Sequence, residues 1–176
     1  IVIADHGATV SMTTTARQGT RWLARAVDEG DMAMGGSRLL FLLRVFRDPD
    51  AARIPMAMRD AYRRMREQEG VSPSPVVPTY LGLQSADAAD VIIIDGVREP
   101  RGALIFLHGL AGSFALPCWE LARAAKEAGL VTYCPSVGWR GDWWAKHGQR
   151  TLERTVELVR ERQLARIYLA GLSNGA

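Results

Sequence analysis

Residues that bind metals or form disulfides are scarce in this chain of 176 residues. It has two cysteines, Cys118 and Cys134, and three histidines, and they are never grouped at the spacing of a metal site. Two cysteines are too few for a disulfide framework, so we expect two reduced core side chains, with a disulfide as the open alternative. A glycine loop that would hold phosphate groups is also missing. The sequence therefore predicts no metal and no other cofactor.

Long hydrophobic runs and an excess of one charge are missing too. The longest apolar run, residues 39–43, ends at Arg44 and is far shorter than the roughly 20 residues that cross a bilayer. The formal net charge is only +3, and many arginines stand among Glu and Ala on expected helices. We therefore predict neither a transmembrane segment nor a nucleic-acid partner. With 48% hydrophobic residues the chain has the composition of a globular protein.

The first part of the chain, residues 1–70, is expected to be a helical N-terminal segment. Its residues 1–36 are rich in Thr, Gly and Ala and have weak periodicity, with one short helix predicted at 20–27. Residues 38–47 are strongly apolar, and we expect a helix buried against another element. The role of the segment stays open between a cap, an oligomer contact and part of a fused module.

A further helix is predicted to begin near Pro55, since proline suits the first helical turn, and to end at Gly70. It carries core residues at spacings of four and three: Met58, Tyr62 and Met65. The next residues, 71–75, read V-S-P-S-P, which is a stiff connector because each proline fixes φ. Residues 71–89 are therefore interpreted as a linker with a possible first strand.

From residue 90 onward, short apolar runs alternate with helical patterns. Strands that are apolar on both faces and alternate with helices predict an α/β fold with a mostly parallel, helix-covered sheet. One crossover helix fits between each consecutive pair of the last three strands. The expected strands are residues 91–94, 103–107, 130–134 and 166–170, and the expected helices are residues 117–128 and 151–162.

Two motifs follow strands in this region. Residues 107–112 read L-H-G-L-A-G, and residues 171–175 read G-L-S-N-G, which fits the G-x-S-x-G pattern of a nucleophile elbow. In this order and context, residues 90–176 resemble the N-terminal half of an α/β-hydrolase, from its second strand to the elbow after its fifth. The resemblance implies an α/β-hydrolase fold that is incomplete in this chain, and a serine hydrolase that forms an acyl-enzyme.

The elbow motif would make Ser173 the nucleophile. A sharp turn from strand to helix lifts such a serine above the sheet and forces it into strained backbone angles. Gly171 and Gly175 flank the turn because side chains at these positions would collide with the crossing backbone.

By the same resemblance, the loop after the earlier strand would form the oxyanion hole. The backbone N–H groups of Leu110 and Asn174 would donate to the oxyanion that forms on the attacked carbonyl. His108 and Gly109 would shape this loop. We interpret His108 as a structural residue and not as the catalytic base.

The acid and the base of the triad follow the serine in chain order in this family. Asp142 and His147 precede Ser173, so we interpret them as solvated loop residues. The resemblance therefore places both partners in a C-terminal part of the protein beyond Ala176, with a second chain as the open alternative, and that part is an expected partner.

Three of the five tryptophans lie in residues 138–144, after the strand at 130–134. Trp139, Trp143 and Trp144 follow the carboxyl end of a parallel strand, where open α/β sheets bind ligands. They form either an aromatic wall of the substrate pocket or ordinary packing of the next helix. Ser113 and Cys118 are interpreted as helix-entry and packing residues.

These observations favour a carboxylesterase or lipase-like enzyme that acts on a small or medium acyl ester. An aminopeptidase or amidase is the alternative on the same fold, since the elbow does not separate esters from amides. A further alternative is a hydrolase-like binding domain without a working triad.

Overall fold

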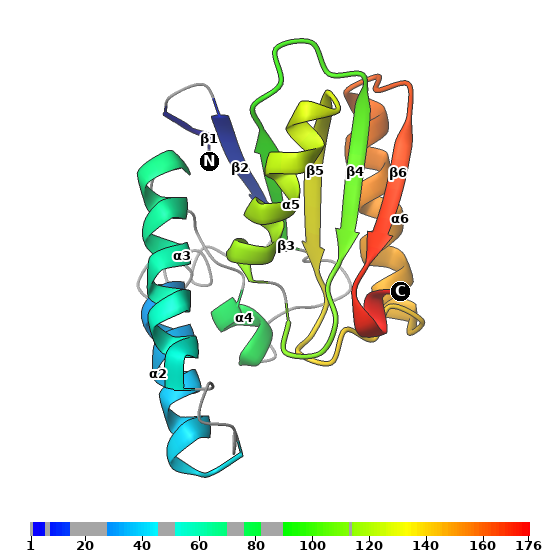
Figure 1. The fold of residues 1–176 in the computed structure, drawn as a ribbon. Coiled ribbons are helices and arrows are strands. Elements are labelled where there is room, and N and C mark those ends of the chain that lie inside the picture. Colours follow the sequence, from blue (N-terminus) through cyan, green and yellow to red (C-terminus); the bar gives the residue numbers. More distant parts are fainter. Residues whose placement is uncertain are drawn as a thin grey trace.

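The computed structural model describes residues 2–5, 8–14, 28–45, 52–69, 76–81, 90–112 and 114–176 (Figure 1). They form a sheet of six strands in the order β1-β2-β3-β5-β4-β6. Its strands are β1 (Val2–Asp5), β2 (Ala8–Thr14), β3 (Asp90–Asp95), β4 (Gly102–Leu107), β5 (Leu130–Ser136) and β6 (Ile167–Gly171). The helices are α2 (Glu29–Leu42), α3 (Ile54–Glu69), α4 (Val76–Tyr80), α5 (Ala115–Glu127) and α6 (Lys146–Glu161), and a 3-10 turn, η2, spans Ser173–Gly175.

The sheet is mostly parallel over its last four strands. β4 pairs in parallel with β5 on one side and with β6 on the other. β3 is antiparallel to β5, and β2 and β1 extend the sheet with further antiparallel pairs. The predicted α/β class, the last four strands and their crossover helices are confirmed. Apolar runs such as Val91–Ile93 of β3 are buried as expected, whereas β6 is largely exposed.

Helices cover the two faces of this sheet from opposite sides, with α5 in front and α6 behind in Figure 1. The core under α6 includes Ile105, Tyr133 and Val159, all fully buried. The core under α5 and α3 includes Phe106, Trp119 and Tyr62. Alternate residues of β4 thus enter opposite cores, as expected for a strand buried on both faces.

The expectation of a helical segment at residues 1–70 is wrong at its start. Residues 2–14 contain the hairpin strands β1 and β2, and β2 pairs with β3 through the register Val10↔Ile94. The alternation of Ala8, Val10 and Met12 with polar residues is a strand signal. It is weak because the surrounding residues are mostly Thr, Gly and Ala. The helix predicted at 20–27 lies outside the described residues.

The apolar run at the end of α2 is not buried, contrary to the prediction for residues 38–47. Leu39, Leu42 and Leu43 are 55%, 76% and 64% exposed. Periodicity indicates an apolar helix but not the presence of a neighbour to cover it, and no element of the described part of the chain buries this end.

The prediction for α3 is confirmed, since the helix begins at Ile54 and buries Tyr62 and Met65. Gly70 and the connector 71–75 lie outside the described residues. The 71–89 stretch contains the short helix α4, and no strand is described there.

Cys118 and Cys134 form a disulfide, so the expectation of two reduced thiols is wrong. Cys118 lies in α5 and Cys134 in β5, with their Cα atoms 6.1 Å apart and both residues fully buried. Both side chains point into the core between helix and sheet, which brings the two sulfur atoms together. The bond fastens the first turns of α5 to the centre of the sheet.

Candidate functional site

The site lies at the carboxyl ends of β4, β5 and β6. β4 leads to α5 on one face of the sheet and β5 leads to α6 on the other, so the chain leaves two neighbouring strands in opposite directions (Figure 1). Open α/β sheets bind their ligands in the crevice at such a switch point. The loop after β4 begins at His108 and the loop after β5 spans residues 137–145, and β6 ends at Gly171, two residues before Ser173.

Ser173 has a backbone conformation that few residues other than glycine adopt. Its φ is +55°, in the left-handed region, immediately after β6. This conformation costs a residue with a Cβ about 1–3 kcal/mol and clusters at functional sites. Arg44 and Gln163 also adopt it, just after the ends of α2 and α6. The expected backbone strain at this serine is therefore confirmed. The residue is exposed, and no described residue forms a hydrogen bond with its hydroxyl.

The two flanking glycines fit so closely that no side chain has room. A Cβ at Gly171 would overlap the carbonyl oxygen of Gly175, and a Cβ at Gly175 would overlap the carbonyl oxygen of Leu107. The N–H of Gly175 donates to the carbonyl of Leu172 over 2.9 Å, which closes the turn. The predicted steric reason for glycine at both positions is confirmed.

The loop after β4 lies directly against this turn. A Cβ at Gly109 would be 2.7 Å from the carbonyl oxygen of Leu172 and 2.8 Å from the Cβ of Ser173. The absence of a side chain at Gly109 thus allows the two motifs to touch, although they are far apart in sequence. The N–H of Leu172 also donates to the carbonyl of Leu107 over 3.1 Å.

Two backbone donors are free at this contact. Neither the N–H of Leu110 nor that of Asn174 donates to a described residue. Ala111 has φ +81° and Gly112 has φ +85°, and the N–H of Ala111 donates to the carbonyl of Trp139 over 2.7 Å. The two consecutive left-handed residues turn the loop sharply just after Leu110. The hydrogen bond of Ala111 holds the loop in place, and the N–H of Leu110 stays available.

His108 is buried inside this loop and binds only backbone. Its Nε2 accepts the N–H of Val137 over 3.0 Å, so the proton of the neutral ring lies on Nδ1, which donates to the carbonyl of Gly109 over 2.8 Å. Burial lowers the pKa of His108 below its usual range, although the bond to Gly109 opposes this shift. A neutral ring with both nitrogens engaged is suited to shaping the loop, as the sequence-based interpretation expects.

The three tryptophans after β5 do not gather in one pocket. Trp143 is buried, lies edge-on to the His108 ring at a centroid distance of 5.2 Å, and donates its Nε1–H to the carbonyl of His108 over 2.8 Å. Trp139 and Trp144 are largely exposed. Packing thus accounts for Trp143, and an aromatic wall formed by the other two stays a prediction.

Asn174 and Gly141 fasten the elbow to the loop after β5. The Nδ2 of Asn174 donates to the carbonyl of Arg140 over 2.9 Å. Gly141 has φ +67°, and a Cβ there would be 2.9 Å from the carbonyl oxygen of Gly109. The three loops at the ends of β4, β5 and β6 are therefore in mutual contact.

Asp142 and His147 do not form a catalytic pair with the serine. Asp142 is 3.7 Å from Arg140 in an ion pair, and His147 is exposed in the first turn of α6. Neither forms a hydrogen bond with Ser173. In the described part of the chain, no three His, Cys, Asp or Glu residues are placed to hold a metal ion, and none of the helices is long and apolar enough to cross a membrane.

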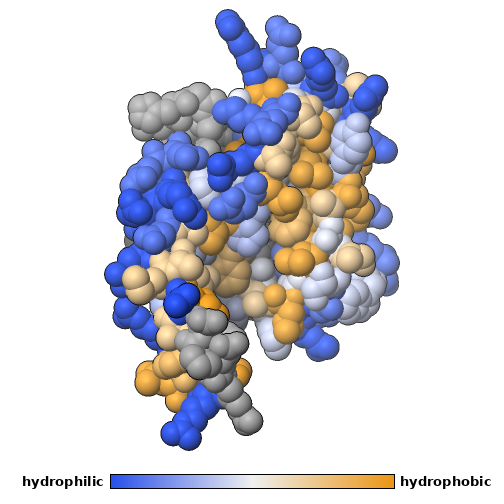
Figure 2. Space-filling view, viewed as in Figure 1, coloured by the Kyte–Doolittle hydropathy of each residue, from blue (hydrophilic) through white to orange (hydrophobic). Residues whose placement is uncertain are grey.

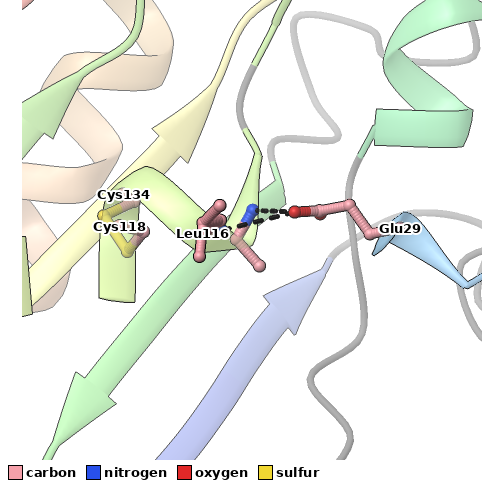
Figure 3. The surroundings of a disulfide bond; sticks show 5 residues. Glu29, Leu116, Cys118 and Cys134 are labelled. Atoms are coloured by element: carbon pink, nitrogen blue, oxygen red, sulfur yellow. Dashed lines mark hydrogen bonds between the residues drawn. A yellow bond between two sulfur atoms is a disulfide. The ribbon is translucent and has the colours of Figure 1, made fainter. Parts of the chain in front are cut away.

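Glu29 is a structural residue of the site that sequence reasoning missed. Its buried carboxylate accepts the N–H of Ala115 over 2.7 Å and that of Leu116 over 3.3 Å, at the N-terminus of α5 (Figure 3). It also accepts the hydroxyl of Tyr62 over 2.8 Å. Burial and the Glu29 carboxylate raise the pKa of Tyr62. An acidic residue in the first turn of α2 indicates a helix start, but not that it caps a second helix.

An apolar cavity of about 560 Å³ lies beside the loop that follows β4 and was also missed. Its wall combines α2, α3 and α4 with Ala111, Phe114 and the first residues of α5. None of the three tryptophans lines it. The spacing of four between Ile54, Met58 and Tyr62 is the sequence signal for the α3 side of this cavity.

Comparisons with protein families, with curated proteins and with solved structures find no match to this chain. Support for a function therefore comes from the strained serine, the free amides beside it and the topology that brings them together.

Proposed function

We propose that this chain carries the nucleophile and the oxyanion hole of a serine hydrolase of the α/β-hydrolase superfamily, which cleaves carboxylic esters through an acyl-enzyme on Ser173. One observation carries the proposal. Ser173 stands at the end of a parallel strand with φ +55°, against a loop in which the amide of Leu110 is free. A strained serine and preorganised donors are what acyl transfer requires.

In this mechanism, the Oγ of Ser173 attacks the ester carbonyl while a base removes its proton. The carbonyl oxygen becomes an oxyanion, which accepts hydrogen bonds from the N–H groups of Leu110 and Asn174. Collapse of this intermediate breaks the ester bond, and the alcohol leaves with the proton. Water then attacks the acyl-enzyme while the base takes its proton, and the base returns this proton to the Oγ of Ser173 as the carboxylic acid is released.

The acid and base of the triad belong, in this proposal, to a C-terminal part of the protein. The exposed apolar side chains of β6 support the presence of a further element that packs against this strand. Ile167, Tyr168 and Leu169 are 40%, 44% and 60% exposed, although apolar residues of an edge strand are ordinarily covered. Figure 2 shows hydrophobic residues gathered over the side of the molecule where β4 and β6 lie.

The proposal is tested with p-nitrophenyl acetate and the matching p-nitroanilide, with Ser173→Ala as control. We expect hydrolysis of the ester with a burst of one p-nitrophenol per protein, and loss of this activity in S173A. Faster cleavage of the anilide would instead indicate an amidase or aminopeptidase. Ester hydrolysis that survives in S173A, or no hydrolysis of either compound by the protein with its C-terminal part, would reject the proposal and favour a binding domain.

A further inference from the structure

The cavity beside the oxyanion loop is built from two helical stripes. Met32, Gly36 and Leu40 stand at spacings of four on α2, and a second stripe on α3 faces them. The opposite wall includes Ala111, which directly follows the oxyanion donor Leu110. The cavity therefore reaches the residue next to the proposed oxyanion donor, and the N-terminal helices form its far side.

The wall of this cavity offers an apolar surface and no charge. None of its lining residues is ionic. The hydroxyl of Ser37 is occupied by a 2.9 Å hydrogen bond to the carbonyl of Met34, and that of Tyr62 by the Glu29 carboxylate. Burial raises the pKa of Tyr80, so its phenol is neutral at physiological pH. A polar ligand would lose its hydration without compensation here, while an alkyl chain would not.

The volume fits a chain of substantial length. Pockets that enclose drug-sized ligands measure roughly 300–1,000 Å³, and this one measures about 560 Å³. An acetyl group would leave most of this space empty.

We propose that this cavity binds the alkyl chain of the acyl group, so that the protein acts on medium-chain fatty acyl esters and the N-terminal helices determine its acyl specificity. The part of this proposal that concerns acyl specificity rests on the serine hydrolase function, because the acyl carbonyl must lie at Leu110 while the alkyl chain passes Ala111. The part that concerns binding of an alkyl chain depends only on the cavity.

Two adjacent glycines of α2 offer a matched test. Gly36 lines the cavity and Gly35 does not, and a Cβ built at either position meets no atom within 4 Å. Both are exposed helical positions, so Gly36→Phe and Gly35→Phe have the same effect on helix propensity. Only G36F places a ring in or at the cavity.

The kinetic experiment compares kcat/KM for p-nitrophenyl esters from acetate to decanoate. With wild-type protein we expect a rise of about fourfold per methylene until the cavity is full, since a buried methylene contributes about 0.8 kcal/mol. In G36F the ratio of octanoate to acetate should fall at least about tenfold, and in G35F it should stay as in the wild type. Equal effects in the two variants would overturn the proposal. So would a response to alcohol length in a series of acetates, since the cavity would then hold the leaving group.

A binding experiment separates this proposal from the catalytic one. Dansyl-labelled undecanoic acid should bind to wild type and to G35F, and at least about tenfold more weakly to G36F, with decanoate displacing it. This result together with absent ester hydrolysis would reject the hydrolase and keep the chain-binding cavity. Hydrolysis at Ser173 without chain-length preference and without probe binding would keep the hydrolase and reject the cavity as an acyl site.

Discussion

The carboxylate of Glu29 accepts the backbone N–H of Ala115 over 2.7 Å, across 86 positions of the sequence. It occupies the N-terminus of α5, where Phe114 supplies no side-chain cap. The N-terminal helices are thereby held against α5, the helix that follows the loop after β4. One carboxylate links the cavity wall, the loop and the sheet core.

Replacement of this carboxylate should destabilise the whole fold. Glu29→Ala leaves the amide of Ala115 and the hydroxyl of Tyr62 without their partner, and we expect a loss of about 3 kcal/mol in the free energy of unfolding, measured with urea. Tyr62→Phe removes one donor only and should cost less. A Glu29→Ala variant as stable as wild type would contradict the role assigned to this contact.

Reduction of the disulfide should also lower stability. Cys118 and Cys134 are separated by 16 positions, and closing a loop of this length stabilises a protein by about 3 kcal/mol in the chain-entropy description. We expect the urea midpoint to fall when reductant is present during unfolding. The Cys118→Ala/Cys134→Ala variant should have a lower urea midpoint than the oxidised wild type, and reductant should not change it. A midpoint that is independent of reductant in the wild type would show that the bond contributes nothing.

Stability should fall in mildly acidic solution because of His108. Burial lowers the pKa of this residue in the folded protein below the value of about 6.5 that it has when unfolded. Above that pH both states are neutral and the stabilising effect is complete. As the pH falls below it, the unfolded chain takes up a proton first, and stability declines by at most about 1.4 kcal/mol per pH unit.

The check on this prediction is the pH dependence of the unfolding free energy between pH 7.5 and pH 5.5 in His108→Asn. This variant should show a smaller decline than wild type. Identical slopes in wild type and H108N would argue against a buried neutral ring at this position.

Glycine is required at the elbow for steric reasons, whereas Gly35 of α2 has room for a side chain. Gly175→Ala places a Cβ against the carbonyl of Leu107, and we expect a loss of at least about 3 kcal/mol together with loss of serine reactivity. Gly35→Ala meets no neighbouring atom and should stabilise α2 by about 0.5–1 kcal/mol. The check is a comparison of the thermal unfolding temperatures of the two variants with that of the wild type. Similar stability in both would show that the elbow relaxes around a side chain.

The sheet strands of the second half were predictable because their apolar runs are long and β-branched. Val91–Ile94 is an example, since its residues fit a strand that is buried on both faces. The elbow was predictable for a different reason, because Gly171 and Gly175 are needed wherever two backbones approach so closely.

The remaining features depend on partners that are distant in sequence. The exposed end of α2 at Leu42 has the same composition as a buried helix, and its exposure depends on what packs there. Glu29 reads as a residue of the first helical turn, while its partners are in α3 and α5. The pairing of Cys118 with Cys134 required the packing of α5 on β5 to be known.

The most direct test of the central claim is covalent labelling with a fluorophosphonate, which reacts only with an activated serine, followed by peptide mapping. The experiment uses the full-length protein, and Ser173→Ala is the control. We predict one label per protein, located on Ser173 and absent from the S173A variant. Label on another residue, or no label on a folded protein, would contradict the assignment of Ser173 as the nucleophile.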